Sequence, residues 1–351
     1  MKLRKFLYII SLLSISIVGC EKQSEEEQSS SERRGGSPKM YLTGSSSDVQ
    51  TNSKFGIALM GGADANTIAE QRAFEFLVDQ SNGGDVVVLR SSGTDGYNSF
   101  IYNDIGGVNS VRTFVITKRS QASHSSLITA VNNAEIIFMT GGNQDDYVSY
   151  WKDTDLETAI NNAVNFNGAS IGGTSAGLAI LGELYYSAAN GTVYSDEALD
   201  DPYDTYMAGL GDRFLDVDYM DNVITDTHYN ERDRQGRHFT FMARMVKDFG
   251  VSASNIKGIG VDEATSVTVD HNGYAKVYGS GDAYFLRGQG KTPETCKSGT
   301  RLTWNDGGQA VKANVLRGTN SGSNEFDMVN WSTNDGSVEY WSANNGNFVR
   351  N

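Results

Sequence analysis

Cysteine, proline and positive charge are all scarce in this chain of 351 residues. Three Pro against 39 Gly exclude a collagen-like protein, and 38% hydrophobic with 21% charged residues argue against a coiled coil or a wholly disordered chain. The 29 Lys and Arg against 43 Asp and Glu give a net charge of -14, so nucleic acid and anionic lipid would repel the protein as a whole. The composition predicts a folded, acidic, globular protein that binds no nucleic acid.

The N-terminal hydrophobic run is too short to cross a bilayer as a helix. Basic residues among the first five precede an apolar run over residues 6–19, whereas a spanning helix needs about 20 apolar residues. The run ends before Cys20, and this junction resembles the lipobox of bacterial lipoproteins, in which the signal is cut before a Cys whose sulfur takes a diacylglycerol. We expect residues 1–19 to be a lipoprotein signal peptide, and Cys20 to anchor the secreted protein in the bacterial cell envelope or at the cell surface. Ordinary secretion with cleavage nearby is the alternative.

If Cys20 carries a lipid, Cys296 has no partner and the mature protein contains no disulfide. The residues after Cys20 also lack the apolar side chains that a core requires. Residues 20–53 are rich in Ser, Glu, Gln and Gly, and such a segment cannot bury enough apolar surface to offset the entropy of ordering it. We expect a disordered tether that carries the globular body away from the membrane.

Residues 54–288 alternate between short apolar runs and longer amphipathic segments, which is typical of βαβ units with a parallel sheet. The predicted strands are 55–60, 85–89, 113–116, 135–140 and 169–171, and the predicted helices are 67–80, 123–133 and 156–166. Several strands end in glycine pairs, such as Gly61-Gly62 and Gly141-Gly142. Ligands of open α/β sheets bind outside the carboxyl ends of the strands, although a Gly-Gly pair alone is more often a plain turn.

The C-terminal part of the sequence has a different character. Short strands are predicted over 266–269, 275–277 and 283–286. Residues 289–351 are rich in Gly, Asn, Ser and Trp and have no helical period, which predicts a β-rich C-terminal extension.

One segment has the spacing of a serine nucleophile. Gly173-Thr174-Ser175-Ala176-Gly177 matches Gly-x-Ser-x-Gly, between a predicted strand and a run of helix-forming residues. Small residues flank the Ser of a nucleophile elbow because its backbone is strained and the following helix packs closely under the strand. The N-terminus of that helix helps to stabilise developing negative charge. We interpret Ser175 as a nucleophile.

A serine nucleophile needs a base, and the sequence offers four His. His124 and His271 are more simply surface groups, and His238 is more simply a packing residue of a helix that begins near Glu231. His228 directly follows an apolar run over 219–224, which places it at a strand end on the same rim as Ser175. We therefore favour His228 as the base.

Three arginines follow this candidate base. A stretch of six residues contains Arg232, Arg234 and Arg237, although the protein as a whole is acidic. A salt-bridged helix start is the ordinary interpretation of such a cluster. Beside a catalytic base, however, guanidinium groups form a fork that binds carboxylates in a bidentate manner, so the cluster favours a substrate that bears carboxyl groups.

These motifs together resemble the cyanophycinase and aspartyl dipeptidase (dipeptidase E) family of serine peptidases, in the same order along residues 54–287. They are Ile137-Phe138-Met139-Thr140-Gly141-Gly142-Asn143-Gln144, then Gly172-Gly173-Thr174-Ser175-Ala176-Gly177, then Asp226-Thr227-His228 with the arginines that follow. The resemblance implies an α/β, flavodoxin-like fold related to class I glutamine amidotransferases, with a mostly parallel sheet and helices on both faces. It also implies a Ser and His catalytic pair that requires no metal and no organic cofactor.

Carried over residue by residue, the resemblance implies that Ser175 is the nucleophile and His228 the general base, with the backbone amides of Ala176 and Gly142 as oxyanion donors. The implied substrate contacts are Gln144, Asp226, Arg232, Arg234 and Arg237. The family also has an acidic third member between nucleophile and base, for which we favour Glu197 over Asp196. Two departures from the family pattern are Thr227, where cyanophycinases typically carry Gln, and a longer segment over 199–218.

Family enzymes release β-aspartyl-arginine from cyanophycin (multi-L-arginyl-poly-L-aspartate), and the resemblance implies this substrate, cleaved through an acyl-enzyme. Members of the family often dimerise, so the resemblance is compatible with a homodimer. A close alternative is an aspartyl dipeptidase acting on short peptides with N-terminal Asp, and a more distant one is a non-catalytic surface binding protein. An α/β-hydrolase esterase would carry a His-Gly pair before the nucleophile, which this sequence lacks.

Overall fold

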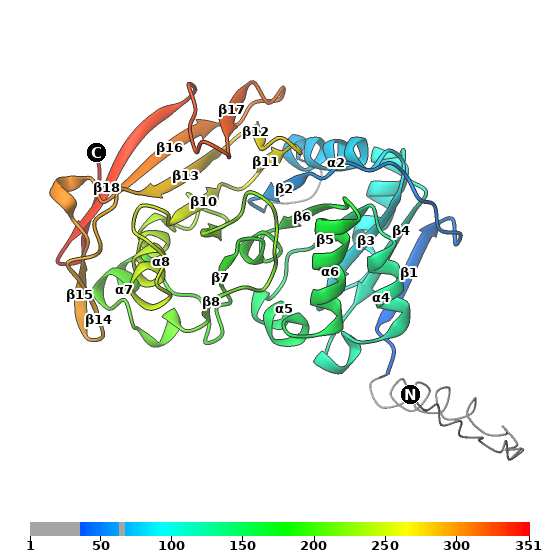
Figure 1. Ribbon diagram of the computed structural model, residues 1–351, viewed down its shortest axis with the longest axis horizontal. Helices are drawn as coiled ribbons and strands as arrows, with labels where there is room; N and C mark the ends of the chain where they lie inside the picture. Colours follow the sequence, from blue (N-terminus) through cyan, green and yellow to red (C-terminus); the bar gives the residue numbers. More distant parts are fainter. Residues whose placement is uncertain (1–35, 63–66) are drawn as a thin grey trace, which may run out of the picture.

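The computed structural model describes residues 36–62 and 67–351 (Figure 1). The predicted signal peptide, Cys20 and residues 21–35 of the predicted tether lie outside the described residues. Among the described residues, no helix has both the length and the apolar character needed to cross a bilayer.

Two large β-sheets form the framework of the described chain. Sheet A contains, in spatial order, β1 (Lys39–Gly44), β4 (Ser110–Val115), β3 (Asp85–Arg90), β5 (Ile136–Met139), β6 (Ser170–Thr174), β2 (Ile57–Met60), β11 (Thr265–Val269), β12 (Tyr274–Gly279) and β17 (Asn324–Asp327). Sheet B contains β19 (Asn347–Arg350), β18 (Ser337–Asn344), β16 (Val311–Arg317), β13 (Asp282–Gly288), β10 (Lys257–Val261), β9 (Val223–Asp226), β7 (Leu184–Tyr186) and β8 (Leu210–Asp212). A separate hairpin pairs β14 (Thr295–Lys297) with β15 (Thr300–Thr303).

The helices connect these strands. The longer ones are α2 (Ile68–Ser81), α4 (Ser125–Asn132), α5 (Gln144–Trp151), α6 (Asp155–Phe166) and α8 (Gln235–Asp248). Shorter helical segments are α3 (Gly96–Ser99), the π-helix η1 (Phe100–Ile105), α7 (Ser195–Asp200) and the 3₁₀ turns η2 (Arg119–Gln121), η3 (Leu178–Ile180), η4 (Thr205–Met207) and η5 (Asp306–Gly308). The five strands and three helices that we predicted before residue 175 are present, with ends shifted by a few residues.

Sheet A is covered by helices on both faces because its strands are apolar on both faces. In β2, Ile57 and Leu59 join the core that contains α4 and α6, whereas Ala58 and Met60 join the core that contains α2. Figure 1 shows α2 on one side of this sheet and α4 and α6 on the other. The mixed α/β architecture with helices on both faces is therefore confirmed.

The strand order departs from the predicted flavodoxin-like arrangement. The mutually parallel strands of sheet A lie in the order β4, β3, β5, β6, β2. When these five strands are numbered in chain order, their spatial order is 3-2-4-5-1. Flavodoxin-like sheets have the order 2-1-3-4-5. The flavodoxin-like order is therefore not confirmed.

Two expectations at the ends of the body need correction. Residues 39–44, which we placed in the disordered tether, form β1, whose six residues pair antiparallel with β4. Residues 289–351 are β-rich, as predicted, but they extend the two sheets of the body. β16 pairs with β13 in sheet B and β17 pairs with β12 in sheet A, and the ring of Phe326 stacks on that of Phe285 with centroids 3.9 Å apart.

The chain crosses between the two sheets near the predicted nucleophile Ser175 and the predicted base His228. β6 of sheet A leads to β7 of sheet B, and β10 of sheet B leads back to β11 of sheet A. Figure 1 shows β10 and β11 joining the two halves of the molecule near the middle of its long axis. Side chains at the ends of β6, β9 and β10 therefore meet at the junction of the two sheets.

Candidate active site

Ser175 follows β6 in the backbone conformation of a nucleophile elbow. Its φ of 51° lies in the left-handed region, which non-glycine residues rarely adopt. A Cβ at Gly173 would lie 2.5 Å from the backbone of Gly177, and a Cβ at Gly177 would lie 2.1 Å from the carbonyl oxygen of Met139. The flanking glycines are therefore required by close backbone packing. The helix expected directly after the elbow is wrong, because the short 3₁₀ turn η3 follows Ser175 there.

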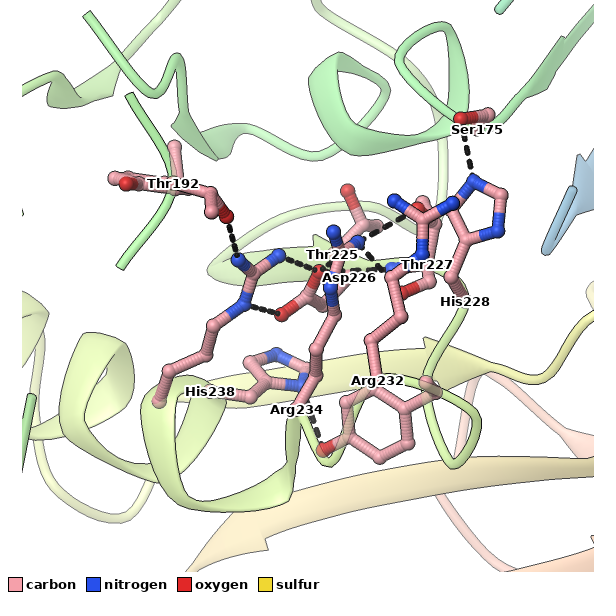
Figure 2. A network of polar contacts seen from close by, with 12 residues as sticks. Ser175, Thr192, Thr225, Asp226, Thr227, His228, Arg232, Arg234 and His238 are labelled. Carbon is pink, nitrogen blue, oxygen red and sulfur yellow. Dashed lines mark hydrogen bonds and ion pairs between the residues drawn. The ribbon is translucent and has the colours of Figure 1, made fainter. Parts of the chain in front are cut away.

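His228 links Ser175 to a carboxylate. Its Nε2 lies 2.7 Å from Ser175 Oγ, and its Nδ1 lies 2.5 Å from Glu263 Oε1. Figure 2 shows the Ser175 hydroxyl and the His228 ring directed toward each other. The predicted contact between Ser175 and His228 is present, across 53 positions of sequence. A chain of hydroxyl, imidazole and carboxylate is the arrangement in which a serine is activated for attack on a carbonyl.

The acidic partner of His228 is Glu263, and the expectation for Glu197 is wrong. Both ring nitrogens of His228 are occupied by Ser175 and Glu263. Glu197 lies in the first turn of α7, where its Oε2 accepts a hydrogen bond of 2.9 Å from the amide of Tyr194 as part of a capping box. The available signal for Glu263 was the acidic pair Asp262-Glu263 after the segment that forms β10; we missed it by looking only between Ser175 and His228.

Burial lowers the pKa of His228 below its ordinary value, although the hydrogen bond to Glu263 raises it. The nearby cations of Arg232 and Arg234 act in the same direction as burial. The imidazole is therefore neutral at neutral pH, which is the form that can accept a proton from Ser175.

Three successive carbonyl groups at the end of β2 hold the three loops that carry these side chains. Their hydrogen bonds are Ser175 N to Met60 O at 3.1 Å, His228 N to Gly61 O at 2.8 Å and Ala264 N to Gly62 O at 2.9 Å. Two carboxylates also link the loop after β9 to the loop after β10 through hydrogen bonds. Asp262 Oδ1 accepts from Asn230 N at 3.0 Å, and Glu231 Oε2 accepts from Glu263 N at 3.1 Å.

Ser175 and His228 line a cleft of about 640 Å³. Arg90, Tyr97 and Phe100 line the same cleft, so it is bordered by loops of sheet A and by α3 and η1. The amides of Ala176 and Gly142, which we expect to act as oxyanion donors, have no hydrogen-bond acceptor within residues 36–62 and 67–351. Two such amides beside a nucleophile are available to a developing oxyanion.

Asp226 and Arg237 form a buried ion pair. Arg237 Nε and Nη2 lie 2.8 and 2.6 Å from the two carboxylate oxygens of Asp226, and each side chain is 3% exposed. Burial alone would raise the pKa of Asp226, but Arg237 and Arg234 hold it at about 2. Arg237 also donates to Thr192 and Val193. We expected both residues as substrate contacts, whereas the structure directs them to each other beneath the site.

The side chains of Arg232 and Arg234 differ in solvent exposure. Arg234 donates 2.8 Å to Thr227 O, and its side chain is 12% exposed, while that of Arg232 is 52% exposed. Figure 2 shows Arg232 and Arg234 on the same side of Asp226 as His228. Arg234 precedes α8, which begins later than our expected helix start near Glu231, so Arg234 and Arg237 do not share a helix face. Gln144, the remaining predicted substrate contact, donates 2.8 Å to Tyr186 O.

The other three histidines have surface or packing roles, as expected. His124 caps α4, and His271 lies in the turn after β11. His238 is fully buried between the Tyr229 hydroxyl and the Ile224 carbonyl. Within the part of the chain that the structure describes, no group of three or more His, Cys, Asp or Glu side chains is placed to hold a metal ion.

Comparison with known proteins agrees with this geometry. The family model described as peptidase family S51 matches residues 107–277, which include Ser175, His228 and Glu263. Over these residues the chain is similar to that family. The chain is 28% identical over 183 residues to a cyanophycinase of Geminocystis herdmanii, covering 52% of this chain and 60% of that protein. It is 26% identical over 181 residues to a cyanophycinase of Synechococcus elongatus, covering 52% and 50%.

The chain thus spans only part of the length of the curated relatives that it matches. Among solved structures, it is similar to a peptidase from an acI-B1 Actinobacterium, with a TM-score of 0.48 and 16% identity over 71% of this chain and 98% of that one. It is also similar to a putative peptidase E protein from Listeria monocytogenes EGD-e, with a TM-score of 0.39 and 15% identity over 65% and 99%.

Truncating Arg237 tests the buried pair. Arg237→Ala leaves the Asp226 carboxylate buried without its main partner, so we expect the free energy of unfolding to fall by about 3–5 kcal/mol. Urea unfolding at pH 7 measures this, with Arg232→Ala as the exposed control, expected to change it by less than about 0.5 kcal/mol. Because the folded-state pKa of Asp226 is lowered, its stabilisation is present above the unfolded value of about 4 and is lost as pH falls toward about 2. Equal stability of the two variants would contradict the assignment.

Replacing Glu263 tests the acidic partner against the rejected one. Glu263→Gln removes the charge that orients and stabilises the His228 imidazolium, so kcat should fall by about 10²–10⁴-fold with little change in fold. The matched control Glu197→Gln should retain kcat within about twofold, because it affects only the cap of α7. Steady-state hydrolysis of an uncharged ester measures both. A larger loss for Glu197→Gln than for Glu263→Gln would restore our original expectation.

Proposed function

We propose that this protein is a serine peptidase that hydrolyses aspartyl peptide linkages, with cyanophycin as the substrate. The observation that carries the proposal is the hydrogen-bonded chain from Ser175 through His228 to Glu263, at the wall of an open cleft. The match to the S51 family model and the cyanophycinase names of the relatives support the reaction class and the substrate.

The proposed reaction has two stages. In the first, Ser175 Oγ attacks the carbonyl carbon while His228 Nε2 takes the hydroxyl proton, and the negative charge on the carbonyl oxygen is held by the amides of Ala176 and Gly142. The C–N bond then breaks as the imidazolium gives its proton to the leaving amine. In the second stage, His228 takes a proton from water, the hydroxide attacks the acyl-enzyme, and the proton returns to Ser175 as the acid leaves. Glu263 stabilises the imidazolium in both stages.

The departures from the cyanophycinase pattern favour one second candidate. Thr227 stands where cyanophycinases carry Gln, and its hydroxyl lies 3.2 Å from Arg234 Nη1. A smaller side chain beside the base changes the shape of the substrate site. Short peptides with N-terminal Asp are therefore the alternative substrate, cleaved by the same mechanism.

Product analysis tests the proposed substrate. The protein is incubated separately with cyanophycin granules and with the dipeptide Asp-Leu, and soluble products are identified by mass. We expect β-aspartyl-arginine from cyanophycin, and no product from either substrate with Ser175→Ala, which keeps the fold. Cleavage of Asp-Leu alone would select the dipeptidase. Full activity of Ser175→Ala would refute the serine mechanism.

We also propose that Cys20 anchors the protein to the cell envelope after secretion. The proposal rests on the residues before Cys20, and an insoluble polymer outside the cell is a substrate that suits a tethered enzyme. Full-length protein should incorporate labelled fatty acid and remain with the membrane fraction, whereas Cys20→Ser should incorporate none and leave that fraction. Identical labelling and fractionation of the two proteins would contradict the anchor.

A further inference from the structure

Arg90 is a cation of the active-site cleft that lies outside the family-matched region. It ends β3 and lines the cleft together with Ser175 and His228. Apart from His228, it is the basic side chain among the described residues that line this cleft. The match to the S51 family model begins at residue 107, after Arg90.

The Arg90 guanidinium is positioned by neutral groups. Its Nε donates 2.5 Å to Ser92 O, and its Nη1 donates to Thr94 O. The φ of Gly93 is 87°, in the region that favours glycine, and a Cβ there would lie 2.4 Å from Nη2, so this turn packs closely against the guanidinium. The loop thus fixes the direction of the side chain through carbonyl oxygens.

No carboxylate neutralises Arg90 within residues 36–62 and 67–351. Ion pairs of the described residues include the neighbouring arginines, since Arg234 and Arg237 contact Asp226 and Arg232 contacts Glu263, but none includes Arg90. Two acidic side chains, Glu70 and Asp104, also line the cleft. Glu70 is hydrogen-bonded to the Tyr97 hydroxyl, and Asp104 lies exposed on η1.

The remaining N–H groups of Arg90 suit a carboxylate. One hydrogen of Nη1 and both hydrogens of Nη2 are not used by the two loop carbonyls. Side-by-side N–H groups of a guanidinium bind the two oxygens of one carboxylate in a bidentate manner. A cation that no carboxylate of the described residues pairs with, and whose direction is fixed in advance, is most readily satisfied by an anionic group of the substrate.

We propose that Arg90 is the residue that recognises a carboxylate of the substrate, the role that we first assigned to the arginines after His228. Arg237 is buried against Asp226 and is not available to substrate. The carboxylate-binding residue is therefore at the end of β3 in sheet A, and not among the arginines on the sheet B side. This inference rests on the proposed function for the substrate class, but its test does not require turnover.

The test measures binding in a Ser175→Ala background, so that failure of the peptidase proposal and failure of this one are distinguishable. Titration calorimetry compares Asp-Leu with Asn-Leu-amide, an analogue that keeps the amino group but has no carboxylate. Adding Arg90→Gln should weaken Asp-Leu binding by about 10- to 100-fold, the range of a charged hydrogen bond, and should change binding of the amide by less than about twofold. Arg90→Lys, which keeps the charge without the fork, should fall between.

Arg119 supplies the matched control. It too donates to two backbone carbonyls, Ser149 O of α5 at 3.1 Å and Asp153 O at 3.0 Å, but it does not line the cleft. Arg119→Gln makes the same change in charge and should leave both affinities unchanged. Equal weakening of the two ligands by Arg90→Gln would mean that Arg90 only holds its loop, and unchanged Asp-Leu binding would mean that the carboxylate binds elsewhere. Either result overturns the proposal, and thermal unfolding of each variant verifies its fold.

Discussion

The end of β2 is the constraint on which the site depends. Ser175 belongs to sheet A, His228 to sheet B and Glu263 to the crossover between them, so no single sheet fixes their separation. The consecutive carbonyls of residues 60–62 hold one loop each. The chain can approach this closely only as glycine, since a Cβ at Gly62 would lie 2.4 Å from the His228 ring. The reactive groups are therefore aligned by backbone atoms whose spacing is set by covalent geometry.

The same junction holds backbone strain. Ser175, His228 and Ala264 have φ values of 51°, 44° and 50°, in a region that costs a non-glycine residue on the order of 1–3 kcal/mol. Each of these residues donates its amide to the end of β2, and the Asp262 and Glu231 carboxylates tie two of the loops together. These hydrogen bonds thus offset the backbone strain at the residues that carry it. A site held in this way has its hydroxyl, imidazole and carboxylate in register before substrate arrives, which is what electrostatic preorganisation requires.

Sequence patterns predicted the parts of the site that are local. The small residues around Ser175 are visible in a window of five positions, and His228 follows a recognisable strand. Glu263 was missed because its contact depends on the crossing from β10 to β11, which no local pattern encodes. Glu197 and Arg237 were misassigned for a related reason, since a carboxylate in the first turn of a helix and a buried arginine look in sequence like functional groups. Their partners, the Tyr194 amide and Asp226, are defined only by the fold.

The distribution of cations bears on how so acidic a protein could bind a carboxylate of the proposed substrate. With a net charge of -14, long-range attraction cannot guide a carboxylate to the cleft, and in physiological salt the field beyond about 8 Å is screened in any case. Recognition must therefore be made at contact distance, by arginines that no carboxylate of the described residues neutralises. Arg237 is neutralised by Asp226, and Arg232 and Arg234 favour the neutral form of His228. These arginines maintain the base, which leaves the carboxylate of the substrate to Arg90 on the opposite sheet.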